Sequence, residues 1–202
     1  ATPEIIWHDS GVTLPYAPIF GIANEFFDAL PIAQFVWRDS VARGGWYHRL
    51  VGLKDDEFCF IDGPALCGAE LAEYGGALLP DPVDGDVAEF CDQDDDVIAA
   101  LAIRISRNGG AMLIIDYGHN GTAGDSLQAI ADHQPVDVFH YPGTADLSHW
   151  VDFNALSKSA TLHGCRLIGP VPQGQFLMRI GLAQRAEQAA LHREPEVRRS
   201  LL

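Results

Sequence analysis

The chain has 202 residues, of which 48% are hydrophobic and 20% are charged, so it holds enough apolar material for one substantial globular core and is not a disordered chain. Its net charge of −15 argues against sequence-independent binding to nucleic acid or to anionic membrane surfaces, which need clustered Lys and Arg. No apolar run approaches the roughly 20 residues that span a bilayer. We therefore expect no nucleic acid and no membrane partner, whereas a basic protein partner is compatible with the charge.

The cysteines give no sign of a metal site. They have neither C-x-x-C spacing nor a nearby pair of histidines that would build a zinc centre. We expect four buried free thiols and no metal: Cys59, Cys67, Cys91 and Cys165.

Two short strands open the chain. Residues Pro3 to Asp9 form the first, and Ala17 to Ala23 form the second, which ends at Asn24. The Gly- and Pro-rich segment between them is too short for a full crossover helix. The second strand is apolar throughout, which is typical of a buried parallel strand, and ligands of open α/β sheets collect at the carboxyl ends of such strands. This predicts a site at Asn24.

Between Phe35 and Asp62 the pattern changes to antiparallel hairpins. Strands are expected over Gln34 to Trp37, Trp46 to Leu53 and Phe58 to Ile61, separated by Gly-Gly and Lys-Asp-Asp turns, and they form an inserted lobe. Residues 81–96 then contain eight acids and no base. This run is either an exposed loop with a helix start or a surface that meets cations.

The next elements return to the α/β pattern. Asp94 to Arg107 is amphipathic and acidic in its first turn, so it predicts a helix that the following glycines stop. Ala111 to Ile115 predicts a third buried strand, which ends in the polar cluster Asp116 to His119. Because ligands gather at such strand ends, this cluster and the one at Asn24 are expected to face one crevice.

The C-terminal part predicts one helix and one hairpin. Asp152 is the expected N-cap of a helix that runs to about His163 and turns Phe153, Leu156 and Ala160 inward. Strands are then expected over Cys165 to Gly169 and Gln175 to Gly181, which would form an antiparallel edge hairpin.

Several segments, in order along the chain, resemble one known family. The octapeptide Asn24-Glu25-Phe26-Phe27-Asp28-Ala29-Leu30-Pro31 closely resembles the signature of the MidA family of class I S-adenosylmethionine-dependent methyltransferases, which are linked to mitochondrial complex I assembly. The further matching segments are Gln34 to Val36, Gly110 to His119, Gly124 to Gln128, Pro142-Gly143, Asp146 to His149, Val151 to Phe153, Gln173-Gly174 and Phe176-Leu177.

The resemblance implies a class I, Rossmann-like α/β fold, S-adenosylmethionine as cofactor, and transfer of a methyl group to an arginine of a partner protein. It places the protein in the bacterial cytoplasm or the mitochondrial matrix. The family's glycine-rich cofactor loop and ribose-binding acid have no counterpart here, so we expect a C-terminal portion of a longer protein. The expected division is 1–34 with 94–192 as the methyltransferase part, 35–93 as an inserted hairpin and acidic substrate-recognition region, and 193–202 as a tail.

Candidate catalytic residues follow the second strand. A guanidinium must be oriented and paired during methyl transfer, which carboxylates do, so Glu25 and Asp28 are candidates. Asn24 is a candidate for both catalysis and cofactor binding. The alternatives are structural, because Asn24 is also a good N-cap and Asp28 a good helix-turn carboxylate.

Further candidates lie at the other strand ends. The resemblance implies that Asp9 contacts the adenine amine, and its alternative is an exposed loop acid. Asp116 and Tyr117 are candidates for substrate binding, with structural capping as the alternative. His149 is a third substrate-binding candidate and, like His119, can shuttle a proton, although a lone His is more often a surface or core residue.

Two other functions compete with the methyltransferase. Gly124-Asp125-Ser126-Leu127 and Asp146-x-x-His149 match the motifs of GDSL-type acyl hydrolases, but in those enzymes the two motifs lie at opposite ends of the chain. We therefore do not expect a hydrolase. The second alternative is a non-catalytic assembly or binding factor that keeps the methyltransferase fold, because a fold alone does not fix a function.

Overall fold

The computed structural model describes residues 5–8, 13–39, 44–74, 78–121 and 124–191, without the side chains of residues 94 and 95. The chain forms two compact units, residues 1–167 and 168–202. The first unit contains, in chain order, β1 (Ile19–Asn24), β2 (Ala33–Arg38), β3 (Gly45–Lys54), β4 (Glu57–Ala65), α1 (Gly68–Tyr74), β5 (Val87–Phe90), α2 (Asp92–Asn108), β6 (Gly110–Ile115), β7 (Gly118–His119), β8 (Gln128–Ala131), β9 (Gln134–Val136), β10 (Asp146–Ser148), β11 (Val151–Asp152) and α3 (Phe153–Leu162). The second unit contains α4 (Gln173–Arg179) and α5 (Leu182–Ala190).

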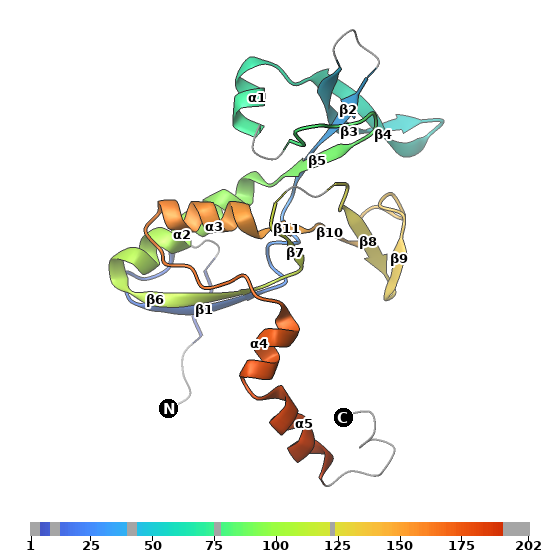
Figure 1. The fold of residues 1–202 in the computed structure, drawn as a ribbon. Helices are drawn as coiled ribbons and strands as arrows, with labels where there is room; N and C mark the ends of the chain where they lie inside the picture. The colour runs from blue at the N-terminus through green and yellow to red at the C-terminus, as the bar shows by residue number, and fades with distance from the viewer. Residues whose placement is uncertain (1–4, 9–12, 40–43, 75–77, 122–123, 192–202) are drawn as a thin grey trace. The chain divides into compact units, whose positions relative to one another are not determined.

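The centre of the first unit is a pair of parallel strands, β1 and β6, paired in register along all six residues of each. Helices α2 and α3 pack against each other and cover one face of this pair (Figure 1). The core between strands and helices consists of Ala23, Phe27, Ile98, Ala102, Val151, Leu156 and Ala160. The predicted strands and helices of this region are therefore confirmed, each within a few residues of its expected ends.

The opposite face of β1 and β6 is exposed. Side chains alternate between the two faces of a strand, and on this face Phe20 is 83%, Ile22 71% and Leu113 37% exposed. The sequence predicted strands buried on both sides. That part of the prediction is wrong for this chain, because the described elements pack only on the face toward α2 and α3.

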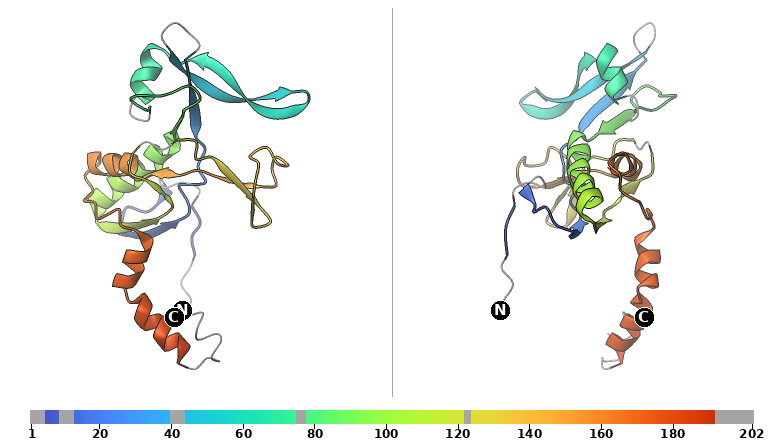
Figure 2. Two further views of the ribbon diagram at one scale, coloured as in Figure 1. Left: turned by 45° about the vertical axis from the view of Figure 1, so that its right-hand side comes forward. Right: turned by 90° about the vertical axis from the view of Figure 1, so that its left-hand side faces the viewer.

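The predicted hairpin lobe is confirmed as a four-stranded antiparallel sheet in the order β4-β3-β2-β5 (Figure 2). Asp55 and Asp56 both adopt positive φ, 54° and 65°, which is the conformation that a two-residue hairpin turn requires. The lobe has its own core of Phe35, Trp46, Leu66 and Ala88. The sequence did not predict β5, which lies inside the acidic run and pairs with β2.

Two predicted strand regions differ from the structure. Residues 5–8 have no regular secondary structure, and the remainder of the strand expected at Pro3 to Asp9 lies outside the described residues. The hairpin expected after α3 is also wrong, because residues 165–172 are irregular and the segment expected at Gln175 to Gly181 contributes instead to α4. Gln, Phe, Leu, Met and Arg in this segment have moderate or good helix propensity, and no described strand pairs with it to favour the extended form.

The cap predicted for α3 is present in the structure. The Asp152 carboxylate accepts from the backbone N–H groups of Asn154 and Ala155, as its predicted role as N-cap requires. All four cysteines are free of disulfides, but the expected burial is wrong, because Cys67 is exposed and the other three are half-buried. Among the described helices, none has the length and apolar character needed to cross a membrane.

Candidate functional site

The polar residues at the ends of β1 and β6 meet, because the two strands run parallel and end at the same edge. Asp116 follows β6 directly. Its Oδ2 accepts hydrogen bonds from the backbone N–H groups of Phe26, Phe27 and Asp28, at 3.2, 3.1 and 3.3 Å. A single carboxylate thus holds the turn that follows β1.

A third segment joins them through Asp28 and Tyr117. The Tyr117 hydroxyl donates a hydrogen bond to Oδ2 of Asp28. The backbone N–H of His149 donates to the Asp28 carbonyl at 3.0 Å, and the N–H of Val151 donates to the Tyr117 carbonyl at 3.1 Å. Three segments that are far apart in the sequence therefore form one cluster, as predicted for the two strand ends.

Burial sets the electrostatics of this cluster. Desolvation is the main cause that raises the pKa of the Asp116 carboxyl above its usual value, the Asp28 carboxylate adds to it, and the backbone N–H donors oppose it. Desolvation likewise raises the pKa of Tyr117, and the hydrogen bond to Asp28 raises it further. Since the ordinary tyrosine pKa is already about 10, the hydroxyl stays protonated at neutral pH and acts as the donor to Asp28.

The candidate residues divide into exposed and buried groups. Asn24 and Glu25 are exposed, whereas Asp28 and His149 are only 6% and 4% exposed. Oδ1 of Asp28 and Nε2 of His149 are buried without a hydrogen-bond partner, as is Nδ1 of His119. Buried polar groups are normally paired, so these atoms mark places where a ligand or a moving segment would gain a contact.

The backbone of Glu25 is in an uncommon conformation. Its φ is 46°, in the left-handed region that residues other than glycine rarely adopt, and its N–H donates to the Ile115 carbonyl at 2.9 Å. Strain of this kind persists only where surrounding contacts impose it, and it is common at functional sites. No local pattern in the sequence indicates this conformation.

Sequence reasoning also missed a polar network beside the cluster. Glu89, on β5, accepts from the side chain of Gln34 at 2.7 Å and from the backbone N–H of Ser126 at 3.0 Å. Arg49 donates to Asp125 at 2.6 Å. These contacts link the four-stranded sheet to the segment before β8. The sign of this network in the sequence is Glu89 itself, a charged residue in the otherwise apolar strand β5.

The contacts of Ser126 and His149 show whether the chain has the catalytic triad of an acyl hydrolase. The Ser126 hydroxyl donates to Glu89 and accepts from the backbone N–H of Trp150 at 2.9 Å. His149 places Nδ1 near the Trp150 carbonyl, and its Nε2 has no partner. The hydrogen bonds that a Ser-His-Asp triad needs are therefore not formed, in agreement with the sequence.

One candidate remains outside this geometry. Asp9, the expected adenine contact, lies outside the described residues. The roles of the other candidates in catalysis and binding stay predictions, although the structure brings Asn24, Glu25, Asp28, Asp116, Tyr117 and His149 to one edge of the sheet.

Comparison with curated proteins finds close relatives. The zebrafish (Danio rerio) and human proteins named protein arginine methyltransferase NDUFAF7, mitochondrial, are each 34% identical over 98% of this chain. The Drosophila melanogaster homologue is 32% identical over 96% of it. The chain spans 45%, 43% and 44% of the length of these relatives.

Solved structures agree on the fold. One solved structure is of a likely methyl transferase from Burkholderia thailandensis, bound to S-adenosyl-homocysteine. It superposes with a TM-score of 0.74 at 24% identity, and the match covers 98% of this chain and 49% of the Burkholderia chain. A second structure from that organism, of an uncharacterized protein, gives 0.73 at 25% identity, covering 94% and 50%. The fold is thus of the class I methyltransferase type. A family model described as "Putative S-adenosyl-L-methionine-dependent methyltransferase" matches residues 2–171, so the chain belongs to this methyltransferase family.

Proposed function

We propose that this chain is part of an S-adenosylmethionine-dependent methyltransferase that transfers a methyl group to an arginine nitrogen of a partner protein. Family membership and the names of the relatives support the reaction class. The observation that carries the proposal is the exposed pair Asn24 and Glu25 at the joint carboxyl end of two parallel strands, where ligands of α/β sheets bind. We propose the bacterial cytoplasm or the mitochondrial matrix as its compartment.

Glu25 is the proposed partner of the substrate guanidinium. A carboxylate binds a guanidinium through charge-assisted, often bidentate hydrogen bonds, which fix the orientation of the attacking nitrogen. Glu25 is exposed, and its strained backbone is imposed by the neighbouring strand rather than by its own preference. These properties suit a residue that is positioned for a ligand.

The buried residues have a supporting role in this proposal. Asp116 accepts hydrogen bonds from the backbone of the turn after β1, and Asp28, within that turn, accepts from the Tyr117 hydroxyl, so both hold the backbone that carries Glu25. Asp28 and His149 are covered in this structure, so in this proposal they act on the substrate through the turn that they hold. This defines Asp28 and Asp116 as positioning residues.

The cofactor contact proposed within the described residues is Asn24. Its amide offers both a donor and an acceptor, which fits the charged amino-acid end of S-adenosylmethionine. When bound, this cofactor supplies an activated methyl group. Asp9 is the proposed contact for the adenine amine. Because the chain spans under half of its relatives, the remaining contacts are proposed to come from other parts of the whole protein.

The test uses the longest natural protein that contains this chain, with methyl-labelled S-adenosylmethionine and a pool of arginine-containing peptides. Cofactor binding is measured by calorimetry and methylarginine by amino-acid analysis. Glu25→Gln is expected to leave folding and cofactor affinity nearly intact and to lower transfer roughly 100-fold or more. Glu187→Gln, at an exposed glutamate on α5 outside the expected substrate-recognition region, is the matched control and keeps the wild-type rate.

Two results would contradict the proposal in different ways. Cofactor binding without methylarginine on any peptide or protein would support the non-catalytic assembly factor instead. Wild-type turnover in Glu25→Gln would remove Glu25 from the mechanism but keep the reaction.

Glu25→Gly separates function from stability. Glycine adopts positive φ without strain, so this variant should be as stable as wild type or more stable by up to about 1 kcal/mol, even though it lacks the carboxylate. Loss of methyl transfer together with unchanged stability is the expected combination. A large loss of stability would show that the Glu25 side chain is structural.

A further inference from the structure

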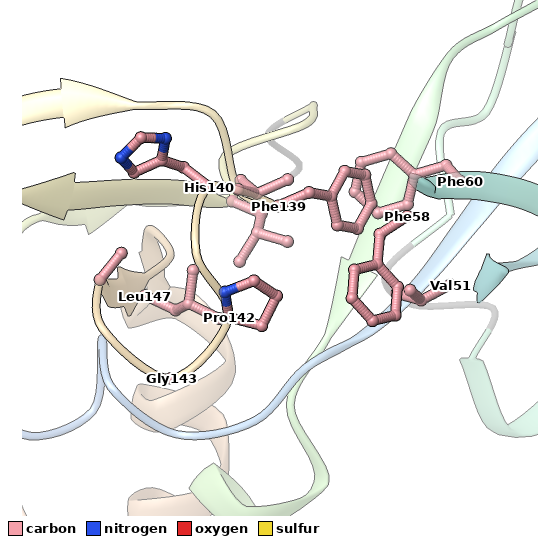
Figure 3. A pocket seen from close by; sticks show the side chains of 11 residues that line it. Val51, Phe58, Phe60, Phe139, His140, Pro142, Gly143 and Leu147 are labelled. Carbon is pink, nitrogen blue, oxygen red and sulfur yellow. The ribbon is translucent and has the colours of Figure 1, made fainter. Parts of the chain in front are cut away.

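An apolar pocket of about 230 Å³ lies between the tip of the β3–β4 hairpin and the loop that leads into β10. Figure 3 shows Val51 and Phe58 from the hairpin on one side, and Pro142 and Leu147 on the other. Phe139 also lines the pocket, with its ring 6.4 Å from the Phe58 ring. For comparison, a cavity of about 150 Å³ in another protein holds a benzene molecule. The pocket therefore has room for one large apolar side chain.

The hairpin wall of the pocket is held in place. The Arg49 guanidinium lies 3.6 Å from the centre of the Phe60 ring, and it donates to Asp125 at 2.6 Å. Asp125 precedes Leu127, which lines the pocket from the other side. The cation–π contact and the ion pair thus connect both walls, so the pocket is a built feature and not a gap beside a loose loop.

The pocket lies next to the candidate site. Leu147 lines the pocket, and His149, two residues further along an extended segment, belongs to the cluster with Asp28. Extended chain advances roughly 3.3 Å per residue, which puts the two positions about 7 Å apart along this segment. An extended peptide covers the same distance in two to three residues, and the arginine side chain would span the remaining distance to Glu25, in the turn whose Asp28 carbonyl accepts from His149.

The surroundings of the pocket favour a basic polypeptide. Glu57, Asp137 and Asp146 are exposed, and each is next in sequence to a residue that lines the pocket. Of two nearby cations, Arg49 is paired with Asp125, and Lys54 lies opposite Glu57 in the β3–β4 register, which leaves Asp137 and Asp146 to meet a basic segment. With a net charge of −15, the molecule attracts positively charged segments over a distance of several ångströms and repels acidic ones.

We propose that this pocket binds an apolar side chain of the size of Phe or Leu that lies two to three residues from the target arginine in the protein substrate. This rests on the proposed methyl transfer to arginine and adds a specificity element to it. Val51, Phe58 and Leu147 are 58%, 47% and 51% exposed, so an incoming side chain would remove existing apolar surface from water.

The test measures peptide binding separately from methyl transfer, again with the longest natural protein that contains this chain. The probes are fluorescein-labelled ten-residue peptides of Gly, Ser and Lys with one central Arg and with a Phe at one of the positions from −4 to +4. Fluorescence polarisation gives the affinity. A Phe two or three residues from the Arg, on one side of it, is expected to tighten binding roughly tenfold or more over the Phe-free peptide.

Variants of the hairpin locate the effect. Phe58→Ser should remove the gain from Phe and leave the affinity for the Phe-free peptide unchanged, and Val51→Ser is the second variant in case the first folds poorly. Ile61→Ser is the matched control, because Ile61 lies on the same hairpin, is 44% exposed, does not line the pocket and, next to Phe60 on the strand, faces the other side of the hairpin. It should keep the full preference for Phe.

The outcomes separate this proposal from the proposed function. Equal affinity for all Phe positions, or an equal loss in the Ile61→Ser control, would overturn the pocket proposal. So would loss of a dimer in Phe58→Ser without any change in peptide affinity, which would assign the surface to a second copy of the chain. Positional binding without methylarginine would keep the pocket and refute the function, whereas methylation without preference for Phe would do the reverse.

Discussion

Replacing Asp116 tests whether its carboxylate organises the site. Two of the N–H groups that Oδ2 accepts, those of Phe27 and Asp28, are part-buried, and the third, that of Phe26, is exposed and can be rehydrated. An unpaired buried N–H costs about 1 kcal/mol or more, so Asp116→Ala should lower the free energy of unfolding by about 2–3 kcal/mol.

Asp116→Asn is the matched variant. The Asn side chain keeps one acceptor oxygen for the turn. Its NH₂ group faces the backbone N–H of Tyr117, which in the wild-type protein donates to Oδ1 of Asp116 at 3.0 Å. The expected loss is therefore about 1 kcal/mol. Urea unfolding followed by tryptophan fluorescence measures both values at constant m. Equal losses in the Ala and Asn variants would refute the reasoning, because they would trace the effect to packing and not to the acceptor.

The pH dependence provides a second check on Asp116. Burial, together with Asp28, raises the pKa of this carboxyl in the folded state, so the folded state binds the proton more tightly than the unfolded state. Stability from this group is therefore greatest below the unfolded pKa of about 4 and decreases as the pH rises through the folded pKa. The Asn variant lacks this dependence. The stability difference between wild type and Asn should grow as the pH falls from 7 toward 4, and a shrinking difference would contradict the direction of the shift.

Three further changes test other parts of the fold. A Cβ added at Gly118 would collide with the Val151 carbonyl, so Gly118→Ala should destabilise by more than about 2 kcal/mol in urea unfolding, whereas Gly124→Ala, with nothing within 4 Å, should be nearly neutral. Asp152→Ala removes the cap of α3 and should cost about 1 kcal/mol, whereas Asp152→Asn should cost much less; equal losses would exclude capping as the cause. The pKa of Tyr117 is raised, so its contribution to stability is present below pH of about 10 and is lost above it. Tyr117→Phe should remove this alkaline loss, and an unchanged profile would count against the Asp28 contact.

Local signals predicted much of this fold. The amphipathic period and the two glycines after it predicted α2, and Asp152 predicted the start of α3. The apolar runs that end in Asn24 and Asp116 predicted β1 and β6 and the place where the polar residues meet. Each of these signals lies within a few residues of the feature it predicts, because caps, turns and side-chain periodicity act over short distances along the chain.

The tertiary structure alone decided the features that depend on distant partners. Asp116 holds a turn that lies 88 to 90 residues earlier in the chain, and Glu89 is paired with Ser126, 37 residues later. The left-handed backbone of Glu25 and the helix found at Gln173–Arg179 also depend on which neighbours are present to pair with them. The pocket at Phe58 has two walls from separate parts of the chain. Such contacts leave no local pattern, since a hydrogen bond or an apolar contact depends on the distance in space and not on the spacing in sequence.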